Sequence, residues 1–289
     1  MRVLFIHGRA QEGKDEHILA QVWEDALKSS FKFAGIEYPK LEIDFPYYGN
    51  QLVELLEEYE EAIASGEYKM KGHSVDLAAE FETELLNDLA EGAGIDLNEA
   101  LQEFGPEYLT RGPLNHKLPL YLIRFIDKYW RVAGNTSISL ATRDVAAYLT
   151  VPLIRKTIND FITSALTVEP TIVIAHSLGS VIAFDMLRDL PFETANIKGL
   201  ITLGSPLGVR SVQRQFIGAL KRPKCLTGDW LNIRDNLDIV SLNSLDNDHF
   251  NVSPPIENIL MENISENHHG ITEYLSNIEI AKFINKCLI

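Results

Sequence analysis

The sequence contains only two cysteines among its 289 residues, and they follow no recognisable pattern. Cys225 and Cys287 lie far apart in the chain, without the spacing of metal ligands, so they predict neither a disulfide framework nor a zinc site. No apolar stretch approaches the length of a membrane-spanning helix, and the first apolar run, residues 3–6, is too short for a signal peptide. We therefore expect a cytoplasmic protein with no integral membrane segment and with no metal or cofactor.

Clusters of basic residues are missing as well. The chain has 26 lysines and arginines against 41 aspartates and glutamates, which gives a formal net charge of -15. Nucleic-acid binding requires grouped basic side chains that displace counterions from phosphates, and an anionic membrane repels an acidic surface. The charge therefore argues against nucleic acids as partners. With 46% hydrophobic and 23% charged residues, the composition is that of a globular protein with a sizeable core.

Strand and helix patterns alternate at both ends of the chain. Short apolar runs predict buried strands over residues 3–6, 41–45, 171–175, 197–203, 230–233 and 256–264. Helical spacing predicts helices over residues 15–33, from Leu178 onward and over 278–288. In the first helix the apolar positions are Ile18, Val22, Trp23, Ala26 and Leu27. The alternation predicts an α/β fold with a mostly parallel sheet of about six strands flanked by helices.

This alternation stops between the second and third predicted strands. Apolar residues at helical spacing predict helices over residues 52–63, 77–89, 122–133 and 145–166, the last of them around Pro152. Glycine and proline residues separate these segments. We interpret residues 51–167 as a helical insertion that lies over one edge of the sheet, while residues 1–50 and 168–289 form the core.

A serine stands at the junction of the third predicted strand and the helix after it. In the stretch Ala175-His176-Ser177-Leu178-Gly179, small residues occupy the positions two before and two after Ser177. A sharp strand-to-helix turn requires small residues at these two positions, and it lifts the serine hydroxyl out of the sheet at a helix N-terminus. Ser177 is therefore the candidate nucleophile, and the side chain of His176 is expected to point away from it.

The turn after the first strand is the candidate partner of this serine. His7-Gly8-Arg9 follows the predicted strand directly. In a site of this kind, a backbone N–H from that loop joins the N–H after the nucleophile to bind the oxyanion. The predicted donors are the amides of Arg9 and Leu178. The Arg9 side chain is expected to be solvated, with binding of an anionic substrate group as the alternative.

A serine nucleophile requires a histidine base and a carboxylate that orients it, in the chain order Ser, acid, His. No acidic residue follows the fourth predicted strand before Asp229, so the next strand has to supply the acid. Asp238, in the loop after that strand, is the predicted acid, and Asp235 is its rival. The predicted base is His269, with His268 as the alternative, because both follow the last predicted strand. The remaining late histidine, at position 249, precedes that strand and comes too early.

Three segments, residues 5–8, 175–180 and 203–207, resemble motifs of the α/β-hydrolase superfamily, particularly of its lipase and esterase members. The resemblance covers the two core regions, and it leaves the helical block matching a lid in position only. It implies a serine hydrolase that cleaves small-molecule or lipid esters through an acyl-enzyme, without metal or organic cofactor. The sheet would be reduced, since the chain starts on what would be the third strand of the full superfamily fold.

Alternatives remain open at this stage. The same triad serves thioesterases, amidases and acyltransferases, and a non-catalytic binding protein can be built on the same scaffold. Phe125, Tyr129 and Trp130 of the predicted lid favour an apolar acyl chain. The acidic helical block is also a candidate docking surface, either for a basic partner or for a second copy of the chain.

Overall fold

A computed structural model describes residues 1–9, 11–67, 76–95, 123, 126, 138–191 and 193–289. Its centre is a six-stranded sheet in the order β2-β1-β3-β4-β5-β6, in which every neighbouring pair is parallel. The strands are β1 (Arg2–Ile6), β2 (Glu42–Asp44), β3 (Pro170–His176), β4 (Asn196–Leu203), β5 (Leu226–Asp235) and β6 (Glu257–Met261). The predicted α/β class and parallel sheet are confirmed, although β5 begins four residues earlier than predicted.

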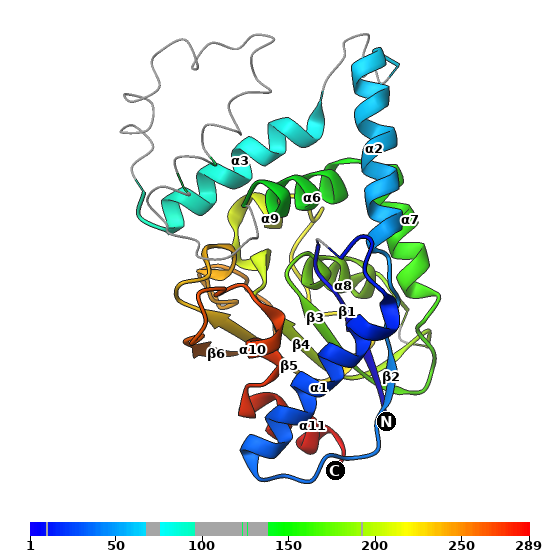
Figure 1. The fold of residues 1–289 in the computed structure, drawn as a ribbon, viewed down its shortest axis with the longest axis vertical. Coiled ribbons are helices and arrows are strands. Elements are labelled where there is room, and N and C mark those ends of the chain that lie inside the picture. Colours follow the sequence, from blue (N-terminus) through cyan, green and yellow to red (C-terminus); the bar gives the residue numbers. More distant parts are fainter. Residues whose placement is uncertain (10, 68–75, 96–122, 124–125, 127–137, 192) are drawn as a thin grey trace.

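Helices cover both faces of the sheet (Figure 1). On one face, α1 (Glu16–Ala34), α10 (Ile271–Leu275) and α11 (Ile278–Cys287) share an apolar cluster with Ile172 and Ile174 of β3. On the other face, α7 (Pro152–Thr163) and α8 (Leu178–Arg188) share a second cluster with Val173 and Ala175. Successive strand residues point to opposite faces of the sheet. A strand that helices cover on both faces therefore has an uninterrupted run of apolar residues in the sequence.

The buried stripe of α1 differs from the predicted one. Asp15 caps the helix by accepting hydrogen bonds from the backbone N–H groups of His17 and Ile18. Ile18 and Val22, two of the five apolar positions of the predicted helix, are 66% and 44% exposed and lie outside its buried face. The buried face instead consists of Leu19, Trp23, Ala26, Leu27, Ser30 and Phe31. These six follow the helical period more closely, and the two exposed residues lie on its border.

The middle of the chain is helical where the structure describes it. The elements are α2 (Gly49–Ser65), α3 (Leu77–Gly92), α6 (Ile138–Thr150) and α7. The helix predicted around Pro152 is two helices, because Pro152 starts α7 at the position where a missing N–H costs no hydrogen bond. Most of the helix predicted over residues 122–133 lies outside the described residues, and so do Phe125, Tyr129 and Trp130.

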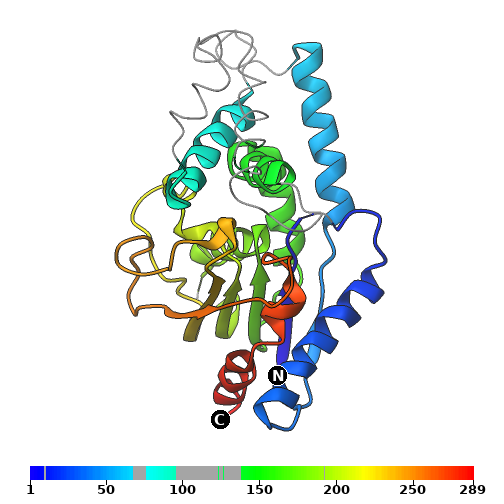
Figure 2. The same cartoon turned by 60° about the vertical axis from the view of Figure 1, so that its left-hand side comes forward.

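Three of these helices, α2, α3 and α6, lie at the end of the sheet toward which the strands point, while α7 packs on a face of the sheet. Figures 1 and 2 both show α2, α3 and α6 together at one end of the molecule. α3 contacts α9 (Arg210–Arg214) and the 3₁₀ helix η4 (Ile239–Ser241), which follow the carboxyl ends of β4 and β5. The helices thus cover the carboxyl ends of the strands rather than an edge strand, and in parallel α/β sheets ligands bind at those ends. None of the helices described in the structure is long and apolar enough to cross a membrane.

Candidate active site

Ser177 occupies a sharp turn between β3 and α8. Its backbone has φ 53° and ψ -126°, and it is the one non-glycine residue with positive φ among those the structure describes. Its N–H still continues the sheet, since it donates to the carbonyl of Leu203 at 3.0 Å. A non-glycine residue in such a conformation costs on the order of 1–3 kcal/mol, and such strain is typical of functional sites.

Two glycines let the chain approach this turn closely. A Cβ atom at Gly179 would lie 2.2 Å from the carbonyl oxygen of Ile6 and 2.5 Å from that of His7. A Cβ atom at Gly8 would lie 3.0 Å from the Cβ of Ser177. The first turn of α8 therefore packs directly against the end of β1, and the loop that starts at Gly8 lies beside Ser177.

Ser177, His269 and Asp238 form a continuous row of hydrogen bonds. His269 Nε2 lies 2.8 Å from Ser177 Oγ, and His269 Nδ1 lies 2.8 Å from Asp238 Oδ2. A carboxylate only accepts hydrogen bonds, so Nδ1 carries the proton and Nε2 is free to accept the serine hydroxyl. Ser177 and Asp238 are each 2% exposed. The predicted base is thus within hydrogen-bond distance of Ser177, and the predicted acid is within hydrogen-bond distance of the base.

Asp238 is held by four donors. Its Oδ1 accepts the Val240 N–H at 3.0 Å, while its Oδ2 accepts the hydroxyls of Tyr274 and Ser241, each at 2.9 Å, in addition to His269. Burial disfavours the charged carboxylate, but His269 and the two hydroxyls outweigh burial and hold the pKa of Asp238 below its ordinary value. A charged, fixed Asp238 can stabilise a positive charge on His269. Nothing in the sequence singled out Tyr274 or Ser241.

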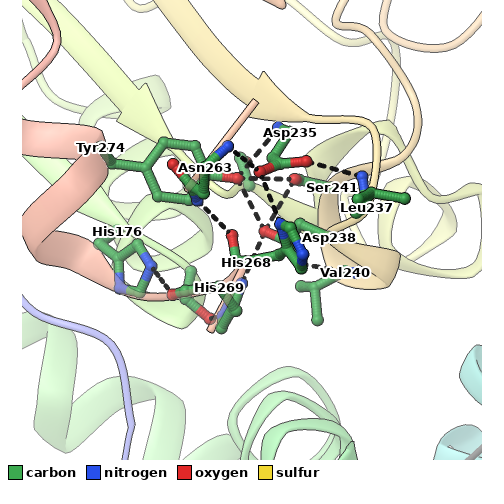
Figure 3. Close-up of polar contacts among 12 residues, drawn as sticks. His176, Asp235, Leu237, Asp238, Val240, Ser241, Asn263, His268, His269 and Tyr274 are labelled. Atoms are coloured by element: carbon green, nitrogen blue, oxygen red, sulfur yellow. Dashed lines mark hydrogen bonds and ion pairs between the residues drawn. The ribbon is translucent and has the colours of Figure 1, made fainter. Parts of the chain in front are cut away.

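The rival acid and the rival base pair with each other. Asp235 Oδ2 lies 3.1 Å from His268 Nδ1, on one side of the Asp238–His269 pair (Figure 3). His249, which was judged to come too early, pairs instead with Asp246 at 3.1 Å. The structure thus brings Asp238 and His269 to Ser177, and it leaves the buried Asp235 and the half-buried His268 as a separate pair.

The His176 side chain, which was expected to point away from Ser177, contacts the base His269. His176 Nε2 lies 3.0 Å from the backbone carbonyl oxygen of His269, and the centroids of the two rings are 4.8 Å apart. Burial, reinforced by the nearby His269, lowers the pKa of His176 to about 3, so its ring is neutral. Because a carbonyl only accepts, the Nε2–H of His176 donates and supports the backbone of His269. This contact joins residues 93 positions apart, which a local sequence pattern does not reveal.

His7 orients the peptide bond that carries the first predicted oxyanion donor. Its Nε2 accepts the Tyr48 N–H at 3.1 Å, which places the ring proton on Nδ1, 2.6 Å from the carbonyl oxygen of Gly8. The ring stacks on Tyr48, and burial lowers the pKa of His7 to about 4. In a planar trans peptide, C=O and N–H point in opposite directions, so the Arg9 N–H points away from His7. The other predicted donor, Leu178, starts α8, and an N–H at that position has no acceptor within the helix.

The Arg9 side chain is buried, and the prediction that it is solvated was wrong. Arg9 is 8% exposed, and its Nε donates to Asp144 Oδ2 of α6 at 2.9 Å. Its Nη1 is buried and has no hydrogen-bond partner among the described residues. Burial raises the pKa of Asp144 even though the Arg9 guanidinium opposes this effect. The ion pair ties the loop beside Ser177 to a helix of the middle block, 135 residues away in the chain.

Within the described part of the chain, no group of three or more histidine, cysteine or acidic side chains is arranged to hold a metal ion. Comparisons with protein-family models, with curated proteins and with solved structures found no match to this chain. The functional interpretation therefore depends on the geometry around Ser177.

Proposed function

We propose that this chain is a serine hydrolase of the α/β-hydrolase type that cleaves carboxylic esters. The observation that carries the proposal is the hydrogen bond of 2.8 Å between Ser177 Oγ and His269 Nε2, continued by the bond of His269 Nδ1 to the buried Asp238. A serine hydroxyl is a weak nucleophile until an adjacent base accepts its proton, and the base needs a third group to orient it. The carboxylate, imidazole and hydroxyl have this order here.

In the acylation step, Ser177 Oγ attacks the ester carbonyl carbon while His269 Nε2 takes the hydroxyl proton. Asp238 stabilises the resulting imidazolium, and the amides of Arg9 and Leu178 receive the negative charge on the carbonyl oxygen. The tetrahedral intermediate collapses when the C–O bond to the alcohol breaks and His269 returns the proton to the departing oxygen. Water then attacks the acyl-enzyme by the same steps, which releases the acid and restores Ser177.

The middle helices serve as the lid in this proposal. The position of α2, α3 and α6 at the carboxyl ends of the strands supports a lid over Ser177, which follows the carboxyl end of β3. The buried Arg9–Asp144 pair supports a direct link between the lid and the oxyanion loop. Residues 1–50 and 168–289 then form the catalytic core, and residues 51–167 contribute the walls that contact the acyl group.

A pre-steady-state assay with 4-nitrophenyl esters tests the proposal. The wild-type chain is expected to release a burst of 4-nitrophenol close to one equivalent per protein, followed by slower turnover, because an activated ester acylates Ser177 faster than water hydrolyses the acyl-enzyme. Matched thioester and anilide substrates measured beside the esters rank the related reaction classes. Absence of both burst and turnover across short and long acyl chains would contradict the proposal.

A further inference from the structure

A second histidine–carboxylate pair lies beside the first and has no part in the proposed chemistry. His268 and Asp235 are neighbours of the base and the acid in sequence, and Figure 3 shows the two pairs side by side. Asp235, the last residue of β5, is fully buried, and the His268 side chain is 22% exposed. Burial of a charged carboxylate lowers the stability of the fold unless its oxygens accept hydrogen bonds. The donors that contact Asp235 therefore identify the groups that it positions.

Asp235 fastens the segment that leads from β6 to His269. Its Oδ2 accepts the backbone N–H of Asn263 at 2.7 Å and the Nδ1–H of His268 at 3.1 Å. The side-chain amide of Asn263 in turn donates to the carbonyl oxygen of His268 at 2.7 Å. His268 is thus held at its ring and at its carbonyl. We call Asp235, Asn263 and His268 the base-loop clamp.

The clamp acts on His269 through the backbone. The carbonyl of His268 and the amide of His269 belong to one planar peptide. A hydrogen bond that fixes this carbonyl therefore also fixes the orientation of the His269 N–H and the position of its Cα. The carbonyl of His269 itself is held by the Nε2–H of His176. With both flanking peptides held, the imidazole position depends on side-chain rotation alone, and the bond to Asp238 sets that rotation.

The two pairs are also joined through one hydroxyl. Tyr274 Oη accepts the backbone N–H of Asp235 at 3.1 Å and donates to Asp238 Oδ2 at 2.9 Å. The end of β5 therefore positions the acid through Tyr274 and the base through the clamp. A shift of Asp235 would move both partners of the Asp238–His269 bond.

From these contacts we infer that Asp235, Asn263 and His268 are positioning residues that hold His269 within reach of Ser177. This inference rests on the proposed function. The clamp touches neither Ser177 nor any other atom assigned to the reaction, so its loss should lower kcat and leave KM unchanged. A misplacement of about 1 Å at a reacting group costs up to about 10²-fold in rate.

Comparison of His268→Leu and His268→Asn with the wild-type chain separates the clamp from general packing. His268→Leu removes the donor to Asp235, and we expect kcat for a 4-nitrophenyl ester to fall between about 10-fold and 100-fold at unchanged KM. His268→Asn retains a donor, since the Nδ2 of asparagine occupies the place of the histidine Nδ1, and it should restore kcat to within about 3-fold of wild type. His249→Leu, which breaks the matched His249–Asp246 pair, should leave kcat unchanged.

Proton NMR of the low-field Nδ1–H of His269 gives a readout that needs no turnover. This resonance should shift or broaden in His268→Leu and return in His268→Asn. Wild-type kcat and an unchanged resonance in His268→Leu would overturn the inference, and so would an equal loss in the leucine and asparagine variants. If wild type itself cleaves no ester, the proposed function fails while the resonance still decides whether the clamp positions His269.

Discussion

Ester hydrolysis is expected to fall by about 10⁶-fold in kcat when Ser177 is replaced by glycine or by alanine, because both changes remove the hydroxyl on which the proposed chemistry depends. The two variants should differ in stability. Alanine keeps a Cβ atom in a backbone conformation with φ 53°, whereas glycine adopts that conformation without steric cost.

The strain at position 177 sets the size of this difference. Relief of about 1–3 kcal/mol of backbone strain exceeds the entropy that glycine adds to the unfolded chain, about 0.5–1 kcal/mol. Ser177→Gly should therefore be more stable than Ser177→Ala by about 1 kcal/mol, equivalent to a Tm about 2–4 °C higher in a chain of this size. Both variants lose the hydrogen bond to His269, so that loss cancels in the comparison.

Initial-rate assays and thermal unfolding of the two variants measure both effects. Ser211→Ala is the matched control, because Ser211 is a buried serine whose Oγ has no hydrogen-bond partner among the described residues. It should retain wild-type kcat, and its Tm should not fall, because alanine removes a hydroxyl that makes no hydrogen bond to the described residues. Ester hydrolysis that persists in both Ser177 variants would exclude Ser177 as the nucleophile, and a lower Tm for glycine than for alanine would contradict the strain argument.

Asp238→Asn is expected to lower kcat by about 10⁴-fold with a small change in KM. An asparagine that keeps its oxygen toward His269 turns its amino group to the N–H of Val240, where two donors face each other. In the opposite orientation the amino group faces His269 Nδ1 and the hydroxyls of Tyr274 and Ser241. Nδ1 must then lose its proton, so Nε2 carries it and can no longer accept the proton of Ser177.

The kcat of Asp238→Asn and of Asp246→Asn, measured on the same ester, tests this argument. Asp246 also pairs with a histidine, His249, but its side chain is 43% exposed and the pair has no contact with the Ser177–His269–Asp238 row. The Asp246 variant should match wild type. A loss smaller than about 10-fold in Asp238→Asn would show that Asp238 does not orient the base.

Local sequence patterns predicted the parts of the fold that short-range geometry determines. The strand, turn and helix around Ser177 follow from an apolar run and from small residues at 175 and 179, and the close crossing of α8 and β1 requires the glycine at 179. The parallel sheet was predicted because strands buried on both faces are uninterrupted apolar runs. The buried face of α1 was harder to predict, since Ile18 and Val22 lie at the border of a stripe whose centre only the packed structure defines.

The choice between neighbouring residues depends on contacts that no local pattern contains. Asp235 and Asp238 are three residues apart at the end of β5, and the bond of Asp238 Oδ1 to the N–H of Val240 orients one of them toward His269. His268 and His269 are adjacent, and Asn263 and Asp235 decide which ring faces Ser177. Chain order favoured Asp238 and His269 but left Asp235 and His268 as alternatives, because every one of these four residues has a partner that only the structure shows.

Long-range packing explains why Arg9 is buried and why His176 contacts His269, neither of which the sequence predicted. Arg9 is buried because Asp144 of α6 lies over the loop after β1, and His176 turns toward His269 because the segment before α10 passes beside the end of β3. Both partners are separated from these residues by more than 90 positions in the chain. A sequence read in local windows assigns such side chains to solvent or to the core without identifying these partners.

The most direct test maps the residue that a fluorophosphonate modifies in the folded protein, because this reagent reacts with a serine only when a base activates it. Peptide mass spectrometry should find a single adduct on Ser177, and the adduct should disappear from the His269→Ala variant. A protein that stays unmodified, an adduct on another residue, or labelling that persists at the wild-type rate without His269 would contradict activation of Ser177 by His269.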